Sequence, residues 1–266
     1  MNEILIAVLA LSGMGLLLGA LLAIASIYFK VDVDERIPMI VEALPGANCG
    51  GCGFAGCDAF ANAVVHADAP LNGCTVGGNE TSRKIADILG RKVVETQKMV
   101  AMVMCKGETG VVRAKYQYYG IEDCIAADML AGGPNACSHG CIGYGTCANI
   151  CPFDAIEMIN GIAAINKEKC TACGKCTHIC PKSIIHLVPY ESKVWVTCSS
   201  TDKGAEIKNK CDVGCIACKL CEKACLYNAI TVTDNLAIID QSKCISCGKC
   251  VAKCPQGIIR TSLTKD

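Results

Sequence analysis

Cysteine spacing is the feature of this sequence that points most directly to chemistry. The chain of 266 residues contains 24 Cys, and the spacing Cys-x2-Cys-x2-Cys-x3-Cys recurs along its second half. In this spacing three neighbouring thiolates bind one [4Fe–4S] cluster, and the fourth binds the cluster of a paired motif. The regular copies span Cys170–Cys180, Cys215–Cys225 and Cys244–Cys254. An altered copy precedes them, with thiols at Cys137, Cys141, Cys147 and Cys151. Four copies in succession predict an iron–sulfur protein.

The motifs belong to a duplicated unit. A shift of 74 residues aligns Cys141 with Cys215 and Cys180 with Cys254, together with the intervening motif cysteines. Each half has the order typical of a two-cluster ferredoxin: a motif, two strands, a second motif, a short helix and a last strand. We expect these strands at residues 156–159, 162–165, 184–188, 230–233, 236–239 and 258–262.

One position breaks the repeat. Cys218 of the second unit aligns with Tyr144, so the first unit lacks its middle ligand. We expect Cys137, four residues before Cys141, to take its place. The first unit then has the sets Cys137, Cys141, Cys147, Cys180 and Cys151, Cys170, Cys173, Cys176. The second unit has the sets Cys215, Cys218, Cys221, Cys254 and Cys225, Cys244, Cys247, Cys250.

A further four-thiol set precedes the duplicated units. It consists of Cys49, Cys52 and Cys57 in a glycine-rich stretch, with Cys74 after Gly73. The glycines allow the backbone to approach a cluster and to donate N–H groups to its sulfurs. A fifth [4Fe–4S] cluster is therefore expected here. Four Cys also suit a structural zinc ion, which is the alternative interpretation.

The remaining cysteines are two from each repeat: Cys105, Cys124, Cys198 and Cys211. A sixth cluster bridging the repeats would use all four. The alternative is that they are buried thiols without a ligand.

The elements that must position these sites begin with an apolar segment. Ile4–Phe29 contains no charged residue and is long enough to span a bilayer. Because Glu3 precedes it and no clear cleavage site follows, we expect an uncleaved anchor in the cell (inner) membrane. Lys30 weakly favours a cytoplasmic location for the rest of the chain, and reduced thiolates suit that compartment.

We expect an α+β chain with four parts: an anchor at 1–30, a four-Cys domain at 31–98, a first ferredoxin-like unit at 99–189 and a second at 190–266. The four-Cys domain should hold helices before Pro45, at 58–65 and at 80–98. Val100–Cys105 and Val194–Cys198 resemble each other as strands that each end in a cysteine.

Other classes of protein are disfavoured. A disulfide scaffold does not explain cysteines that repeat as metal-ligand spacings. The sequence has no nucleotide-binding glycine motif, no HExxH pair and no basic stripe for nucleic acid, so no catalytic residue is predicted. Residues 137–266 carry 15 Lys and Arg against 11 Asp and Glu. This bias could help to dock an acidic partner, and the lysines within the motifs, Lys175, Lys219 and Lys249, are candidates; an ordinary solvated surface is the simpler explanation. His178, between Cys176 and Cys180, is expected to face solvent.

The chain resembles the B subunit of Rnf-type ion-translocating ferredoxin:NAD oxidoreductases in its long form. The resemblance rests on the apolar N-terminal helix, on residues 48–57 (Asn-Cys-Gly-Gly-Cys-Gly-Phe-Ala-Gly-Cys) with Cys74, and on the ferredoxin motifs that follow. It implies a translocase subunit that accepts electrons from soluble ferredoxin. Its [4Fe–4S] clusters would relay them to membrane and NAD-site subunits while the complex moves Na⁺ or H⁺.

Two alternatives remain at this point. The chain could be a polyferredoxin subunit of another membrane oxidoreductase, such as a hydrogenase or a molybdenum enzyme. It could also be an iron–sulfur sensor or a storage protein. We expect electrons to enter at the outer ferredoxin unit and to leave at the Cys49–Cys74 site, nearest the anchor.

Overall fold

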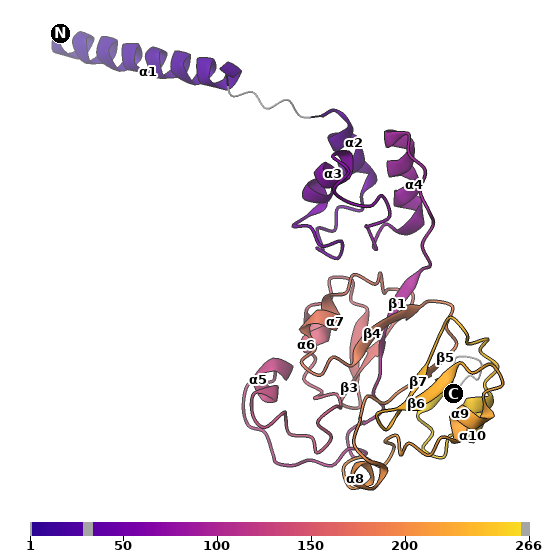
Figure 1. Ribbon diagram of the computed structural model, residues 1–266. Coiled ribbons are helices and arrows are strands. Elements are labelled where there is room, and N and C mark those ends of the chain that lie inside the picture. Colours follow the sequence, from indigo (N-terminus) through magenta and orange to yellow (C-terminus); the bar gives the residue numbers. More distant parts are fainter. Residues whose placement is uncertain (1, 29–33, 262–266) are drawn as a thin grey trace.

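The structure is a computed structural model that describes residues 2–28 and 34–261 (Figure 1). Helix α1 (Asn2–Tyr28) contains the apolar segment as far as Tyr28, and its residues Ile4–Tyr28 have a mean hydropathy of 2.5 over the most apolar window; Phe29 lies outside the described residues. Of the described helices it alone is long and apolar enough to cross a membrane. Lys30, on which the expected orientation depends, lies outside the described residues.

Three helices form the four-Cys domain: α2 (Arg36–Ala43), α3 (Cys57–Val65) and α4 (Gly78–Leu89). They pack around Phe60, Ile40, Val64 and Ile85, each at most 1% exposed. Helix α4 is shorter than the expected 80–98, because Gly90 takes a left-handed conformation (φ 62°) that ends it. The chain then runs extended into β1.

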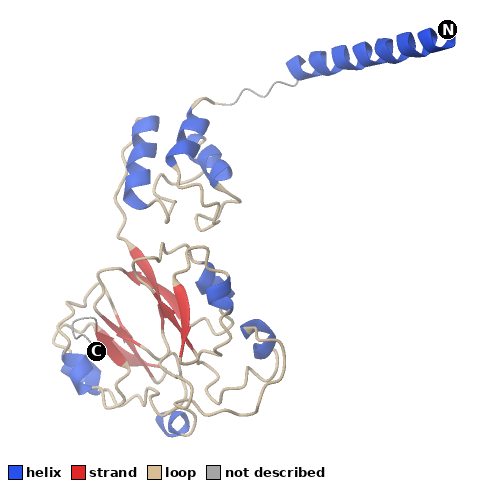
Figure 2. Cartoon of the chain, turned by 180° about the vertical axis from the view of Figure 1, so that it is seen from behind, coloured by secondary structure: helices blue, strands red, loops and turns tan. Residues whose placement is uncertain are grey.

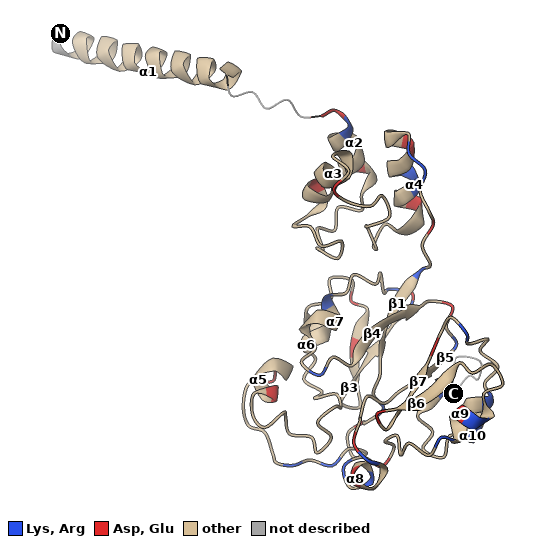
Figure 3. Cartoon of the chain, in the orientation of Figure 1, with Lys and Arg blue, Asp and Glu red and all other residues tan. Residues whose placement is uncertain are grey.

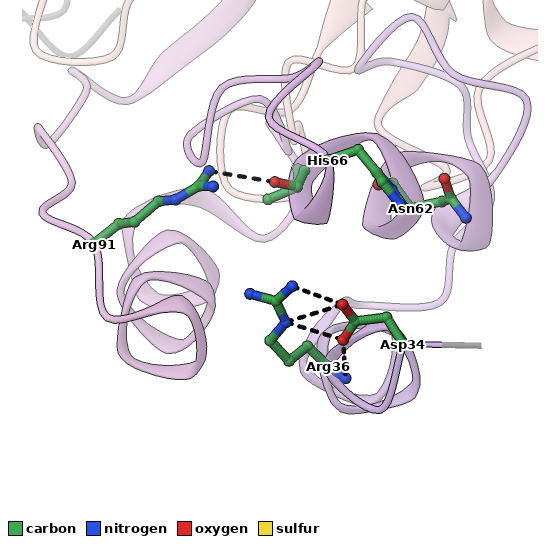
Figure 4. A network of polar contacts seen from close by, with 6 residues as sticks. Asp34, Arg36, Asn62, His66 and Arg91 are labelled. Carbon is green, nitrogen blue, oxygen red and sulfur yellow. Dashed lines mark hydrogen bonds and ion pairs between the residues drawn. The ribbon is translucent and has the colours of Figure 1, made fainter. Parts of the chain in front are cut away.

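Polar contacts close this domain at both ends (Figure 4). Arg36, the first residue of α2, forms an ion pair with Asp34 at 2.6 Å. After α4, the Arg91 guanidinium donates a hydrogen bond of 3.5 Å to the Val64 carbonyl at the end of α3. The segment that leads out of α4 is thereby tied to the helix that begins at Cys57.

Each ferredoxin unit contains two two-stranded antiparallel sheets. In the first unit β1 (Met99–Val103) pairs with β4 (Ile185–Pro189), and β2 (Ile156–Ile159) pairs with β3 (Ile162–Ile165). In the second unit β5 (Val194–Val196) pairs with β8 (Ile259–Thr261), and β6 (Ile230–Thr233) pairs with β7 (Leu236–Ile239). The predicted strands 156–159, 162–165, 230–233 and 236–239 are confirmed, and the last strands begin one residue later than predicted. Ser262 lies outside the described residues.

Short helices lie around these strands (Figure 2). The first unit has α5 (Cys124–Asp128), α6 (Thr146–Asn149) and α7 (Lys175–Ile179). The second has α8 (Gly204–Lys208), α9 (Leu220–Ala224) and α10 (Lys249–Lys253). Ile184 and Ile258, which the 74-residue shift aligns, are each 1% exposed in the two unit cores. Five of these six helices carry a cysteine in their first turn, at Cys124, Cys147, Cys176, Cys221 and Cys250, and most other cysteines of the two units lie in loops.

Candidate metal centres

The motif cysteines of the second unit line two hollows. One is lined by Cys215, Cys218, Cys221 and Cys254 and has about 330 Å³ of empty space. The other is lined by Cys225, Cys244, Cys247 and Cys250 and has about 360 Å³. Each hollow therefore contains the four thiols that the sequence spacing groups together, with the fourth thiol of each motif crossing to its partner.

In the first unit, one hollow repeats this arrangement and the other does not. Cys151, Cys170, Cys173 and Cys176 line a hollow of about 340 Å³. The second hollow, of about 390 Å³, is lined by Cys124, Cys141, Cys147 and Cys180. The expected fourth member, Cys137, is absent from this hollow, and Cys124 takes its place. The structure thus places Cys124, and not the expected Cys137, beside the other three thiols of this set, and the choice of ligand is a proposal taken up below.

The physical reason lies in how α5 is held. Asp123 caps this helix, since its carboxylate accepts hydrogen bonds of 2.9 Å from the N–H groups of Ile125 and Ala126. The Thr146 hydroxyl donates a hydrogen bond of 2.7 Å to Asp123 and accepts one of 2.7 Å from the Cys124 N–H. The Ala126 N–H and the Thr146 hydroxyl hold the pKa of the Asp123 carboxyl below its usual value. Asp123 and Thr146 thus fix Cys124 beside the motif that begins at Cys141.

Tyr144, at the position aligned with Cys218, packs against Tyr118 with a ring-centroid distance of 5.4 Å. This pair lies over the buried cluster of Cys124, Ala127 and Ile142. The two aromatic side chains therefore help to bury Cys124.

Cys137 lies elsewhere. A further hollow, of about 370 Å³, is lined by Cys105, Cys137, Cys198 and Cys211, with Cys141 also at its wall. Hence the expected sixth set, Cys105, Cys124, Cys198 and Cys211, differs from the observed grouping by the exchange of Cys124 for Cys137.

Of the set in the four-Cys domain, Cys49, Cys52 and Cys74 lie in loops and Cys57 begins α3, and all four thiols are partly exposed. Burial raises the pKa of Cys74, against the effect of hydrogen bonds from the backbone, including one of 3.3 Å from the Gly77 N–H. The charges of Cys49 and Cys52 raise the Cys74 pKa further, as expected of neighbouring thiolates. The Cys57 N–H donates to the Asn48 side chain at 2.8 Å, which fixes the start of α3.

This domain meets the first ferredoxin unit at a close backbone contact. A Cβ atom added to Gly51 would lie 2.7 Å from the carbonyl oxygen of Cys173. Only glycine fits at that distance, so the loops that carry Cys49, Cys52 and Cys173 lie against each other. The four-Cys site and the Cys151–Cys176 site are therefore neighbours.

Burial raises the pKa of several thiols. It raises the pKa of Cys141 to about 12 and those of Cys147, Cys176 and Cys221 to about 11. Without iron these groups are protonated at neutral pH, so binding of iron must displace protons. Among the described residues no group of three or more His, Cys, Asp or Glu is arranged around a single ion. The thiols instead surround hollows, and four-thiol sets of this spacing fit [4Fe–4S] clusters.

The chain matches three family descriptions. Residues 44–76 match "Putative Fe-S cluster", which favours iron over zinc at Cys49–Cys74. Residues 133–181 and 214–258 each match a "4Fe-4S dicluster domain". Cys105, Cys124, Cys198 and Cys211 lie outside all three matched ranges.

Relatives that match nearly the whole of this chain are named as B subunits of ion-translocating complexes. The B subunit of an ion-translocating oxidoreductase complex from Methanosarcina acetivorans is 46% identical over 97% of this chain and 99% of its own length. The B subunit of a Na⁺-translocating ferredoxin:NAD⁺ oxidoreductase complex from Acetobacterium woodii is 46% identical over 97% of this chain and 78% of its own length. The B subunit of a proton-translocating ferredoxin:NAD⁺ oxidoreductase complex from Clostridium ljungdahlii is 41% identical over 98% of this chain and 93% of its own length.

Proposed function

The chain belongs to the family of B subunits of Rnf-type ion-translocating ferredoxin:NAD oxidoreductase complexes, and from that premise we propose how its sites are used. It is an iron–sulfur, electron-transfer subunit of a translocase and works with the other subunits of its complex. Membership of this family over nearly the whole chain disfavours the polyferredoxin, sensor and storage alternatives. We propose that electrons enter at the second ferredoxin unit and leave at the four-Cys domain.

The residues that would hold the clusters follow from the hollows. We propose five sites with these ligands: Cys49, Cys52, Cys57, Cys74; Cys151, Cys170, Cys173, Cys176; Cys124, Cys141, Cys147, Cys180; Cys215, Cys218, Cys221, Cys254; and Cys225, Cys244, Cys247, Cys250. A [4Fe–4S] cluster supplies reversible one-electron chemistry, with a potential set by burial and by N–H donors to its sulfurs. The protein holds successive sites next to each other and shields them from water. The parts 1–30, 31–98, 99–189 and 190–266 are the proposed domains.

A difference between two aligned cysteines supports the proposed direction of electron transfer. Cys173 is covered by Gly51 of the four-Cys domain, whereas its counterpart Cys247 is exposed. Of the 24 cysteines, all of which are described, only Cys218 and Cys247 are exposed. The face that the first unit uses for an internal neighbour is thus open on the second unit, where an external redox partner can approach.

The surroundings of Cys247 suit an acidic protein. We call the exposed side chains of Lys219, Lys223, Lys249 and Lys253, with Leu226 and Ile245, the outer face. Lys223 lies on α9 and Lys249 and Lys253 lie on α10, and these two helices carry blue, basic positions in Figure 3. Leu226 and Ile245 are 69% and 57% exposed and would add apolar contact. Positive charge around an apolar patch steers and docks an acidic partner, and we propose that this partner is reduced soluble ferredoxin.

We also propose that the cluster domains lie on the cytoplasmic side of the membrane. Free thiols that must bind iron need a reducing compartment, and all 24 cysteines are unpaired. The helix α1 would hold the chain at the membrane, beside the subunits that accept its electrons.

Charge reversal on the outer face tests the proposal. In the purified complex, Lys249→Glu with Lys253→Glu should raise the KM for ferredoxin at least about tenfold at low salt, because attraction becomes repulsion. The effect should shrink as ionic strength rises. Lys208→Glu on α8, an exposed position away from α9 and α10, is the matched control and should leave KM unchanged. An unchanged KM in the double variant would place ferredoxin elsewhere.

A further inference from the structure

Four thiols remain outside the five proposed sites, and they share one hollow. Cys105, Cys137, Cys198 and Cys211 line a space of about 370 Å³. The four hollows of the ferredoxin motifs measure about 330 to 390 Å³. The remaining hollow thus has the size of the motif sites and is lined by four unassigned thiols, together with Cys141 of the neighbouring set.

These thiols come in two equivalent pairs, one from each unit. Cys105 lies two residues beyond the end of β1, and Cys198 lies two residues beyond the end of β5, so each follows the strand that opens its unit. Cys137 and Cys211 each lie four residues before the first cysteine of a motif. The same hydrogen bond recurs in both units: the Cys141 N–H donates to Cys105 Sγ, and the Cys215 N–H donates to Cys198 Sγ, each at 3.4 Å.

The two pairs are held together by contacts between the units. The Arg113 N–H donates to the Lys210 carbonyl at 2.9 Å, and the Asp212 N–H donates to the Val111 carbonyl at 3.1 Å. The Arg113 guanidinium also pairs with Asp212 at 2.9 Å. Cys137, Cys211 and Ile207 form one buried apolar cluster with Val111 and Val112. The loop from the first unit therefore fixes Cys211 of the second unit beside Cys137 of the first.

The backbone approaches the sulfurs closely, as it does around iron–sulfur clusters. The Gly107 N–H donates to Cys105 Sγ at 3.3 Å. A Cβ atom on Gly107 would lie 3.5 Å from Cys105 Sγ and 3.9 Å from Cys211 Sγ, and one on Gly140 would lie 3.5 Å from Cys137 Sγ. N–H donors to sulfur stabilise the charge of a thiolate-bound cluster.

We propose that Cys105, Cys137, Cys198 and Cys211 bind a sixth [4Fe–4S] cluster, which bridges the two ferredoxin units. The position of this cluster indicates that it passes electrons between the two units. This role rests on the proposed function. Cys141 lines both this hollow and the neighbouring hollow of Cys124, and the Cys215 N–H contacts Cys198 from the second unit. The bridging site therefore touches one site of each unit. One electron taken from a reduced neighbour would be returned as one electron to the next, with no change in bonding.

Iron counting on the whole chain tests the site independently of activity. The anaerobically purified subunit should hold about 24 irons and 24 sulfides, since six cubanes contain four of each. Cys211→Ser should lower both counts by about four. Cys105→Ser with Cys211→Ser should lower them by the same amount and no more, because both thiols serve one cluster. Ser138→Ala, next to Cys137 but exposed and outside the lining of this hollow, is the matched control and should keep the full count.

The wild-type count alone decides the question if a variant fails to fold. About 20 irons in the wild type, with Cys211→Ser unchanged, would mean that these four are spare thiols and would overturn the proposal. Mass spectrometry that finds disulfides among them in the anaerobic protein would overturn it as well. A count of 24 in a subunit that fails to accept electrons from ferredoxin would refute the proposed donor and leave the bridging cluster standing.

Discussion

The two ferredoxin units share one arrangement of strands and thiols but solve one ligand position differently. In the proposed ligand sets the second unit uses Cys218 from within its motif, and this thiol is exposed. The first unit has Tyr144 there, and Cys124, only 9% exposed, lines the hollow from α5. The comparison teaches that the fold fixes where a thiol must be in space, while the chain segment that supplies it can change.

This difference in ligand position also indicates different roles for the two units. A motif ligand at an exposed loop leaves the second unit open to a partner, whereas a ligand supplied from a separate helix closes the first unit. Tyr118 and Tyr144 add aromatic cover to the first unit, and Gly51 covers Cys173. We interpret the first unit as the internal link and the second as the point of contact.

Giving the first unit the ligand pattern of the second unit should have the largest effect on iron content. Cys124→Ser should remove about four irons from the first unit, because three thiols and a hydroxyl hold a cubane poorly. Adding Tyr144→Cys should restore the ligand pattern of the second unit and recover the iron. The measurement is iron and sulfide content with EPR spectra of the reduced chain.

Cys137→Ser is the informative control for this exchange. It should also cost about four irons, but Tyr144→Cys should not restore them, because Cys137 lies in the bridging hollow. Rescue of Cys137→Ser and not of Cys124→Ser by Tyr144→Cys would return the assignment to the one expected from sequence.

Sequence spacing predicts most of the observed grouping of thiols because the members of a motif are local. Three thiols within seven residues can meet only around one centre, and the 74-residue repeat pairs the motifs. The position of Cys124 beside Cys141 could not be predicted, because it depends on a fold-back of residues 105–123 and on the Asp123–Thr146 contact, neither of which has a spacing signature. One signal was present: Cys211 precedes a complete motif and needs another role, and the repeat then gives Cys137 the same role.

The fold was predictable to a similar degree. The order of elements typical of a two-cluster ferredoxin, together with the repeat, located the strands of both units to within a residue or two. The end of α4 was missed because the apolar positions continue to Val93, while the local preference of Gly90 for a left-handed conformation ends the helix. The packing of Gly51 on Cys173 joins separate segments and is visible only in three dimensions.

Core truncation tests whether the two units are equal in stability. Ile184→Ala and Ile258→Ala remove aligned side chains, each 1% exposed, and each should cost about 2–4 kcal/mol of unfolding free energy. Chemical denaturation of the cluster-loaded chain, followed by loss of visible absorbance, would measure this. A cost well below 1 kcal/mol for one of them would show that its unit derives its stability from the clusters and not from its apolar core.

A larger side chain at Gly51 should affect electron exchange only where the four-Cys domain contacts the first unit. Gly51→Ala places a Cβ against the Cys173 carbonyl, so the loops must separate. We expect electron exchange between the four-Cys site and the first unit to slow by about tenfold, equivalent to roughly 1.4 kcal/mol. Rapid mixing with reduced ferredoxin would measure it, and iron content should stay full. Gly51→Val should slow exchange further; equal rates in all three proteins would mean that electrons leave by another route.

The smallest expected effect concerns the hydrogen bonds of Asp123 and Thr146 that hold Cys124. Asp123→Asn keeps an acceptor for the helix N-terminus, whereas Asp123→Ala removes it together with the partner of Thr146. Neither residue is repeated in the second unit, where Thr197 and Leu220 occupy the aligned positions. Asp123→Ala should therefore speed chelator-induced iron loss from the first unit by a few-fold and leave the second unit unchanged, with Asp123→Asn close to wild type. Equal acceleration in both units would show that α5 stabilises the whole chain and has no special role in presenting Cys124.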